Sequence, residues 1–429
     1  MGFSATLVYL ALALISPWAA YPELANLRIM VWLMGMIVLV TFLQVLFGRT
    51  SLWVPQVPLL GIFLSWTMLS VAMSGWLGGA VVALSQVMVP VAAYVALVAN
   101  VNSSSRIRWL CWGLVLIATY LSVRVILAFQ FGVDLEIYAL SETVGGGEKG
   151  SVAVTIYRAR ALGFLADPND LAQYLVACLP LAGLPWQRGR SISNTFQVVL
   201  PLCLMGGALY LTRSRGGLIG LAFVATVAAS RVSRFAAPVV GAGLVAGMLA
   251  MGFSGGRAES LSEGTGASRI ELWSDALVAA AEHPIFGIGY GSITEYLGSF
   301  TAHNSYLLCL VETGVPGLFF WLAAFTVTYF QVWPMLSDPT VSEEARRFCR
   351  LGLMSLASAM VTSFFLSRSY ALTLYIFLGL ATAEFLVARQ EQSAPSPAFR
   401  SSWLAWNGAV AFLLIGTAYV LVRLRWMSG

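Results

Sequence analysis

The sequence predicts an all-α integral membrane protein, a polytopic bundle of about 12 transmembrane helices, or 13 if every apolar run spans. The chain is 59% hydrophobic and only 10% charged, whereas soluble domains carry about 25% charged residues. Its mean hydropathy is +0.82. Apolar runs of roughly 17–25 residues, long enough to cross a bilayer, recur along the whole chain. Such a chain lacks the polar residues to cover a water-facing surface, so lipid is its expected solvent.

The candidate spans follow one another along the chain. They are 3–20, 28–47, 57–74, 79–98, 108–129, 168–186, 195–211, 216–231, 235–253, 305–333, 347–366, 370–388 and 403–422. If one run is re-entrant or interfacial, twelve remain. No Lys or Arg precedes the first run, so we interpret it as a retained helix rather than a signal peptide.

Arginines in short loops predict the orientation. They fall on alternate loops, which should face the cytoplasm: Arg49, Arg106, Arg108, Arg188, Arg190, Arg231, Arg234, Arg346, Arg347, Arg350, Arg389 and Arg400. Segments 130–167, 212–216 and 254–304 then lie outside. We therefore expect a single membrane domain, 1–429, with external elaborations at 130–167 and 254–304. The side of the C-terminus stays open, because Arg423 and Arg425 would fall outside.

The first external segment ends in a helix start. Asp167 stands at the cap position, a proline follows, and Asp170 is the acid of the first turn. Asp167 is therefore a capping residue or, alternatively, a site residue. Ahead of it, Arg158 and Arg160 are two residues apart and share a face if the segment is extended. They are either an anion-binding pair or solvated charges.

The second external segment contains a short amphipathic helix from about 268 to 281, opened by a capping box. Its apolar face consists of Ile270, Trp273, Leu277 and Ala280, which predicts a helix on the membrane surface. Arg269 pairs within this helix or belongs to the site. The "GIGYG" at 287–291 follows no strand, so we interpret it as a tight loop rather than a dinucleotide motif.

A broken helix follows in "FTAHNSYLLCLVETGVPGLFFWL". Asn304 can cap a helix over 305–313, and Gly314 with Pro316 should interrupt it before a new helix begins at Gly317. Irregular backbone at membrane depth must be buried in protein or line a wet cavity. We therefore expect His303, Asn304 and Glu312 to border a cavity that opens to the outside.

The chemistry of the external residues points to an anion. In "LYLTRSRGGLIG", Arg213 and Arg215 come just before Gly216 and Gly217, whose amides would be bare at a helix start. Bare amides, the positive helix end and two guanidiniums suit a phosphate or diphosphate. The alternative is a pair of interfacial anchors. His303 could deprotonate a hydroxyl or be a structural histidine.

Other classes of site find little support in the sequence. No DxD triplet occurs and carboxylates are sparse outside, so we expect neither a metal nor a cofactor. The net charge of +5 comes from one lysine and 23 arginines, about half of which are expected cytoplasmic anchors. Nothing indicates binding to nucleic acid.

Three stretches resemble the signatures of a known family. "RARALGFLADPNDLAQYL", "TRSRGGLIG" and "TAHNSYLLCLVETGVPGL" resemble, in this order, motifs of the O-antigen ligase and polymerase superfamily. "SRIELWSDAL" and "HPIFGIGYGS" look like the segment ahead of the family's histidine. The resemblance covers 157–320.

The resemblance implies a GT-C glycosyltransferase in the inner membrane of a Gram-negative bacterium, with a periplasmic active site. It implies a glycan donor on undecaprenyl diphosphate. Ligases of the family transfer this glycan to lipid A–core, and polymerases transfer it to another lipid-linked repeat. By the match, His303 and Arg215 correspond to the family's histidine and arginine. Arg158 and Arg160 correspond to its basic stretch.

The combined hypothesis is an O-antigen ligase that works without metal and inverts the anomeric centre. Its partners would be the lipid-linked donor, lipid A–core and membrane lipids. A polymerase of the same superfamily is the first alternative. A lipid-linked oligosaccharide transporter is another, but it would need a cavity reachable from both sides and often an internal repeat, which the sequence does not show.

Overall fold

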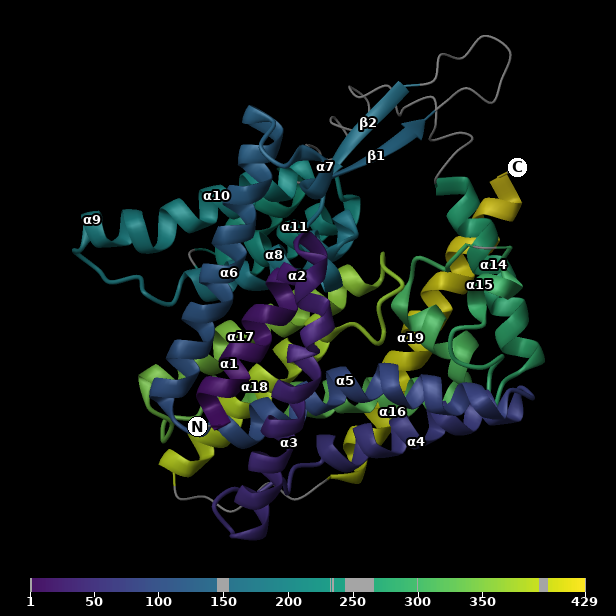
Figure 1. Cartoon of the computed structure of the whole chain (residues 1–429), viewed down its shortest axis with the longest axis horizontal. Helices are drawn as coiled ribbons and strands as arrows, with labels where there is room; N and C mark the ends of the chain where they lie inside the picture. The colour runs from purple at the N-terminus through teal and green to yellow at the C-terminus, as the bar shows by residue number, and fades with distance from the viewer. Residues whose placement is uncertain are drawn as a thin grey trace. The chain divides into compact units, whose positions relative to one another are not determined.

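A computed structural model describes residues 2–144, 154–231, 233, 235–243, 266–298, 300–392 and 400–428. Helices dominate these residues, as expected, and the chain forms two compact units (Figure 1). The first unit comprises Met1–Thr50, Ala96–Gly252 and Glu343–Thr362, and the second comprises Ser51–Val95, Phe253–Ser342 and Ser363–Gly429. The single domain expected over 1–429 stays a prediction, as does the external placement of 130–167 and 254–304.

The first unit contains the segments with most of the candidate arginines. Its elements are α1 (Gly2–Ile15), α2 (Pro17–Ala20), η1 (Pro22–Leu27), α3 (Ile29–Leu46), α6 (Ser104–Phe131), α7 (Leu135–Tyr138), β1 (Ala139–Val144), β2 (Val154–Ala159), η2 (Gly163–Leu165), α8 (Pro168–Ala182), α9 (Ser191–Asn194), η3 (Thr195–Val199), α10 (Leu200–Leu211), α11 (Arg215–Ser230) and nearly all of α17 (Glu343–Ser363).

Helix α8 lies at the centre of the first unit, packed by α6, α10 and α11. Nearly all its side chains are buried. Two glycines let α11 approach it. A Cβ at Gly217 would lie 2.7 Å from the Ala172 Cβ, and one at Gly220 would lie 2.9 Å from a Val176 methyl. Close helix contact through small residues is typical of membrane bundles.

One short β-hairpin accompanies the helices. Strands β1 and β2 form an antiparallel hairpin beside α7, with Leu140 opposite Arg158 (Figure 1). The residues 155–157 are Thr, Ile and Tyr, which favour a pleated backbone. Strand β1, with the sequence "ALSETV", has a weak β pattern, so its pairing comes from the partner strand rather than from its own residues.

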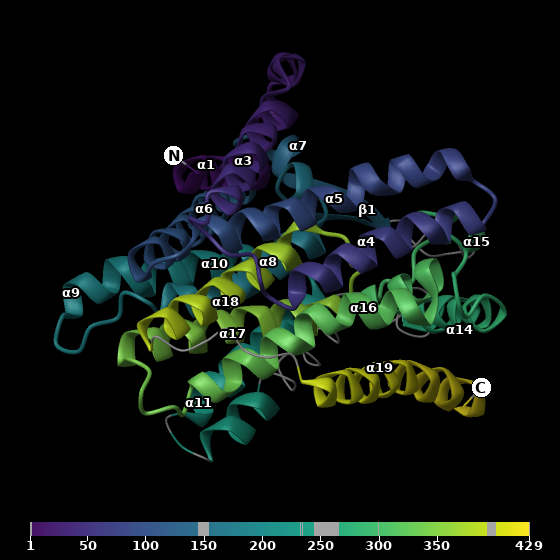
Figure 2. The same cartoon turned by 90° about the horizontal axis from the view of Figure 1, so that it is seen from below.

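The second unit is built around the helix that follows His303. Its elements are α4 (Gln56–Met73), most of α5 (Leu77–Asn100), α14 (Gly266–Glu282), α15 (Ile293–Tyr296), α16 (Ser305–Met335), α18 (Leu372–Glu391) and α19 (Ser401–Ser428). Helix α16 packs against α4, α14, α18 and α19. Figure 2 shows α4 and α16 running side by side.

The predicted break in α16 is confirmed. Gly314 has φ 69° and ψ −175°, which interrupts the helix. The carbonyls that the break leaves bare accept hydrogen bonds from outside α16. Ile288 N–H reaches Val311 O at 2.9 Å, Gly289 N–H reaches Glu312 O at 3.1 Å, and the Trp66 indole reaches Thr313 O at 2.9 Å. The loop at 287–291, with Gly287, Gly289 and Gly291 at positive φ, is the tight loop that the sequence predicts.

Helix α14 packs against protein, and its expected position on the membrane surface stays a prediction. Its apolar face packs on α16 and α19, and Trp273 and Ala280 are buried. The Trp273 indole donates to Ala302 O at 2.6 Å. An apolar stripe fits a protein neighbour as well as it fits lipid, so periodicity alone could not separate the two.

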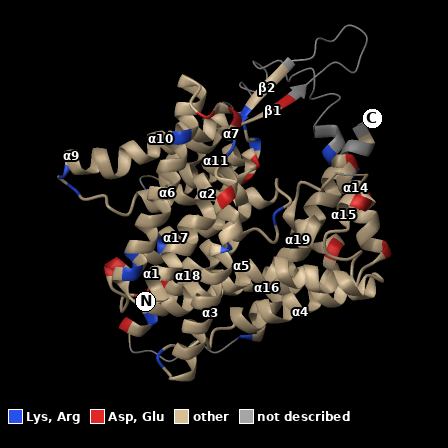
Figure 3. Ribbon diagram, viewed as in Figure 1, with Lys and Arg blue, Asp and Glu red and all other residues tan. Residues whose placement is uncertain are grey.

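Among the described residues, nine helices are long and apolar enough to cross a membrane. The charged side chains lie mainly at helix ends and in loops (Figure 3). Expected spans at 168–186, 216–231 and 347–366 are helices α8, α11 and α17, which fall short of that length or hydropathy. Most of 235–253 lies outside the described residues. The total of about 12 stays a prediction.

Candidate functional site

Residues 212–215, here called the arginine loop, join α10 to α11 in the first unit. Ser214 caps α11, with its Oγ accepting the Gly217 N–H at 3.1 Å. Thr212 Oγ1 accepts the Ser214 N–H at 3.2 Å. Between them Arg213 has φ 50°, a left-handed conformation that costs a non-glycine residue on the order of 1 kcal/mol. The surrounding contacts must hold it there.

Two segments from earlier in the chain hold the arginine loop. From β2, Arg158 Nε donates to Thr212 O at 3.1 Å. From the start of α8, Asn169 Oδ1 accepts the Ser214 hydroxyl at 2.8 Å and Arg158 Nη2 at 3.1 Å. Three motifs that are separate in sequence thus meet in one hydrogen-bond network.

The arginines of this network differ in their accessibility. Arg213 and Arg215 are exposed, and neither guanidinium forms a hydrogen bond or ion pair with any residue that the structure describes. The Arg158 side chain is only 11% exposed and also pairs with Glu142, Nη1 to Oε1, at 2.8 Å. All three of its nitrogens therefore have protein partners. Arg213 and Arg215 can receive an anion, whereas Arg158 supports the loop.

Arg160 does not join this network. Its Nε and Nη2 donate to the carbonyls of Ile137 and Glu136, at 3.2 and 3.3 Å. The spacing of two residues indicated a shared face with Arg158, and the extended backbone of β2 agrees. The side chains nevertheless have different partners, because Arg160 lies just beyond the strand, against α7.

Of the two glycines after Arg215, Gly217 does not offer the bare amide that the sequence indicated. Both are buried, and the Gly217 amide is bound by its cap. A side chain at Gly217 would collide with α8. The glycine therefore serves helix packing, and any anion affinity of the loop must come chiefly from the guanidiniums.

Asp167 is confirmed as a helix cap. Its Oδ1 accepts the Asn169 N–H at 2.7 Å and the Asn169 side-chain amide at 3.0 Å. Asp170, in the first turn of α8, is buried. Asp167 therefore reaches the arginine loop only through Asn169.

In the second unit, His303 immediately precedes α16. It is half-buried and has φ 46°. Asn304 caps the helix as predicted, its Oδ1 accepting the amides of Tyr306 at 2.9 Å and Leu307 at 3.2 Å. The cap is fully buried, and its Nδ2 has no hydrogen-bond partner in the described part of the chain.

Neighbouring backbone fixes the residues around His303. Ser305 Oγ donates to Leu366 O at 2.6 Å and accepts the Arg368 N–H at 2.9 Å. Ser369 Oγ donates to Ser305 O at 2.5 Å. With the Trp273 bond to Ala302, these contacts restrain the chain on both sides of the histidine.

Glu312 lies deeper along α16 and is buried. Its Oε1 accepts the Gly291 N–H at 3.0 Å, and Oε2 has no partner among the described residues. Burial, with the nearby carboxylate, raises the pKa of Tyr290 to about 12 and raises that of Tyr370 well above its usual value. Asn304 and Glu312 are therefore enclosed by protein side chains and backbone, and the expected cavity that opens to the outside stays a prediction.

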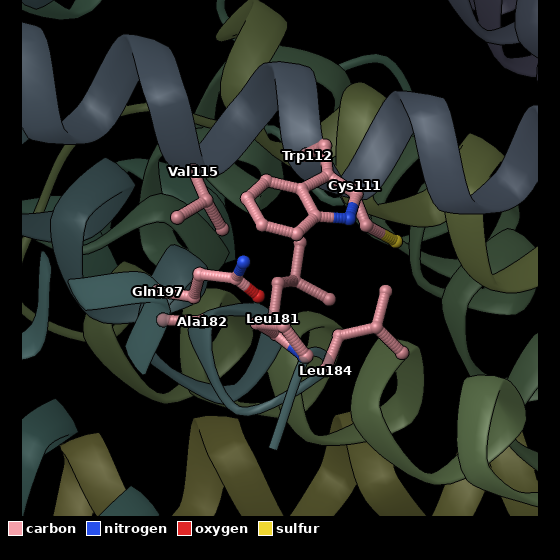
Figure 4. A pocket seen from close by; sticks show the side chains of 8 residues that line it. Cys111, Trp112, Val115, Leu181, Ala182, Leu184 and Gln197 are labelled. Atoms are coloured by element: carbon pink, nitrogen blue, oxygen red, sulfur yellow. The ribbon is translucent and has the colours of Figure 1, made fainter. Parts of the chain in front are cut away.

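Arg269, in the first turn of α14, is half-buried in the second unit, whereas the arginine loop belongs to the first. A small pocket in the first unit is also separate from the candidates. Figure 4 shows Trp112 and Val115 of α6 facing Leu181 and Gln197. No charged side chain lines it. No three His, Cys, Asp or Glu side chains gather at a potential metal site in the regions that the structure describes.

Sequence reasoning missed Asn169, Ser214 and Glu142. Asn169 lies within the quoted "DPN" and Ser214 lies between the two arginines, but each looked like ordinary helix-start chemistry. Their cross-links join residues 45 and 11 positions apart, Ser214 with Asn169 and Arg158 with Asn169. Capping rules describe only local contacts, so no local signal could reveal these bonds.

Comparisons with known proteins agree with the motifs. Residues 200–322 match the family model described as O-antigen ligase. The chain is 30% identical over 193 residues to an O-antigen ligase of Pseudomonas aeruginosa. This alignment covers 43% of the chain and 46% of the relative, so the chain spans about half the relative's length. The residues that match the family model include the arginine loop and His303. Residues 200–322 are therefore similar to the O-antigen ligase family, and this region contains two of the three motifs that carry the resemblance in the sequence.

Proposed function

We propose that this protein is a GT-C glycosyltransferase that moves a glycan from undecaprenyl diphosphate to a saccharide hydroxyl. The observation that carries the proposal is the arginine loop. It presents the exposed Arg213 and Arg215, two residues apart in the sequence, on a backbone fixed by Arg158 and Asn169. Guanidiniums bind phosphate oxygens bidentately and stay charged at any physiological pH.

In the proposed reaction, the acceptor oxygen attacks the anomeric carbon as the bond from that carbon to the diphosphate breaks. The bonding electrons leave with undecaprenyl diphosphate. Arg213 and Arg215 stabilise the negative charge that develops on the diphosphate. His303 takes the proton of the acceptor hydroxyl as general base. Attack opposite the leaving group inverts the anomeric centre.

The buried cap supports the role assigned to His303. Asn304 and Ser305 fix the backbone on one side of the ring, and the Trp273 contact fixes Ala302 on the other. A general base needs a defined position relative to the hydroxyl that it deprotonates.

We further propose lipid A–core as the acceptor, which makes the protein an O-antigen ligase in the inner membrane with its site facing the periplasm. The match of residues 200–322 to the O-antigen ligase family model and the similar Pseudomonas aeruginosa ligase favour this acceptor. A polymerase of the same superfamily would use the same donor chemistry with a second lipid-linked repeat as acceptor.

Reconstitution tests the proposal. Purified protein in liposomes receives the lipid-linked glycan together with two competing acceptors, lipopolysaccharide core and a second lipid-linked repeat. A ligase glycosylates the core. A polymerase lengthens the lipid-linked chain instead. Movement of intact donor across the bilayer without transfer to either acceptor would establish a transporter and reject the enzymatic proposal.

A further inference from the structure

We infer that Asn169 is a positioning residue for the diphosphate-binding arginines, acting through Ser214 and Arg158. The inference rests on the proposed function of Arg213 and Arg215. Asn169 forms no hydrogen bond with the guanidinium of Arg213 or Arg215 in the described part of the chain; it binds Ser214, the cap between them, and Arg158, which holds the backbone of Thr212. Asn169 is therefore expected to fix the positions of Arg213 and Arg215 and not to contact the ligand itself.

The arginine loop needs such support. A four-residue connection with Arg213 in the left-handed region would relax to a commoner conformation if nothing opposed it. Beyond its backbone bonds to the flanking helices α10 and α11, side-chain bonds tie the loop to β2 and α8: Arg158 to Thr212 O, and Ser214 to Asn169. Asn169 takes part in both, since its Oδ1 also accepts Arg158 Nη2.

The direction of the Asn169 amide follows from its partners. The Asp167 carboxylate accepts the Asn169 Nδ2–H, which turns Oδ1 toward the two donors, Arg158 and Ser214. The Ser214 hydroxyl can then donate to Asn169 while it accepts the Gly217 N–H. Every hydrogen bond in the series from Asp167 through Asn169 and Ser214 to the Gly217 amide of α11 thus has a matched donor and acceptor.

A neutral amide suits this position better than a carboxylate. An aspartate at 169 would place a second negative charge beside Asp167, with which Asn169 now makes two hydrogen bonds. It would also place an anion close to a site meant for diphosphate. Asn169 transmits the restraint without cancelling the field of the arginines, which is what a preorganised anion site requires.

The test measures binding of undecaprenyl diphosphate to the full-length protein in detergent. Asn169→Ala should weaken binding about 10-fold and Arg215→Ala about 10–100-fold. The double variant should be no more than about 2-fold weaker than Arg215→Ala alone, because the links act through the arginines. Asn194→Ala is the control: it removes two side-chain hydrogen bonds of an asparagine elsewhere in the first unit, both to Gln187, and should bind normally.

Ser214 tests the same link from its other end, which keeps the test valid if Asn169→Ala does not fold. Ser214→Ala should weaken binding, and Ser214→Thr, which keeps the hydroxyl, should restore it. Fully multiplicative losses in the double variant, or equal losses in Asn194→Ala, would overturn the positioning role. Normal binding in Asn169→Ala alongside weak binding in Arg215→Ala would do the same while the proposed function stands. Normal binding in Arg215→Ala would reject the proposed function itself.

Discussion

The starts of α11 and α16 share one backbone design. Each has a left-handed residue, Arg213 with φ 50° or His303 with φ 46°, followed by an extended capping residue and then the helix. In both, the cap's side-chain oxygen accepts amides of the first turn. Non-glycine residues rarely take this conformation, and such positions cluster where a side chain must be aimed.

The surroundings of the two starts differ. At α11 the cap is joined to distant side chains, and the flanking arginines are exposed. The caps Ser214 and Asn304 are both buried, but at α16 the segment 366–369 holds the next residue, and the candidate side chain is half-buried. The start of α11 exposes the charges of its arginines to solvent. The second is built to hold one ring in a fixed place, which is why we assign binding to the first and proton transfer to the second.

The largest expected effect follows from this division of roles. His303→Ala should reduce glycan transfer by on the order of 10²–10⁴-fold, the usual range for one general base. Donor binding should remain, because the arginines hold the diphosphate without the imidazole. Transfer in proteoliposomes and binding of undecaprenyl diphosphate, measured on the same preparation, separate the two effects.

A glutamine at 303 sharpens the same comparison. His303→Gln keeps hydrogen bonding but cannot accept the proton, so its activity should be nearly as low as that of the alanine variant. Recovery of activity with glutamine would show that the residue only orients the acceptor. Loss of donor binding in His303→Ala would instead place the histidine in the diphosphate site.

Arg215 should show the opposite pattern. Arg215→Ala should weaken donor binding about 10–100-fold, since a charge-assisted hydrogen bond contributes about 1.5–3 kcal/mol. Arg215→Lys should recover little, because lysine lacks the bidentate fork. Isothermal titration with undecaprenyl diphosphate measures both. Arg190→Ala, which removes another exposed arginine of the first unit, is the matched control. Near-normal turnover in Arg215→Lys would make the residue a membrane anchor.

The caps themselves should differ in their effect on stability. Asn304→Ala leaves two buried amides without partners and should cost about 2 kcal/mol. Asp167→Ala removes a cap that is only half-buried and should cost about 1 kcal/mol. Thermal unfolding in one detergent ranks the two variants. Equal losses of stability, or a larger loss for Asp167→Ala, would contradict the prediction that the more deeply buried cap, Asn304, contributes more to stability.

The last prediction is that removal of metal ions has no effect on glycan transfer. Excess EDTA should leave the rate of glycan transfer unchanged, because the arginines are expected to carry the charge of the leaving diphosphate. The control is the same assay after addition of Mg²⁺ or Mn²⁺. Loss of transfer on chelation, restored by either cation, would refute the arginine-only mechanism.

Local sequence rules predicted much of the structure at the starts of α8 and α16. The cap at Asp167, the cap at Asn304 and the break at Gly314 all follow from residue type and spacing, and all are confirmed. The "GIGYG" loop was also predictable, because glycine tolerates the positive φ that its turns need. These features depend on a few consecutive residues.

Contacts between distant residues set what could not be predicted. Arg158 looked like an anion ligand until its bonds to Thr212, Asn169 and Glu142 were visible. Gly217 looked like an anion-binding glycine, but a helix nearly fifty residues earlier explains it: a Cβ there would collide with Ala172. The hairpin likewise depends on pairing between β1 and β2, which neither strand's pattern indicates alone.

The break in α16 constrains the order in which the chain assembles during synthesis. Pro316 has no amide to donate to Glu312 O, so even an unbroken helix would leave that carbonyl bare. Here Ser70 Oγ reaches it at 2.6 Å, and Gly289 N–H reaches it as well. A bare carbonyl in hydrocarbon costs several kcal/mol. Both donors leave the ribosome before α16 does, so we expect α16 to settle in the bilayer only against α4 and the 287–291 loop, which act as its template.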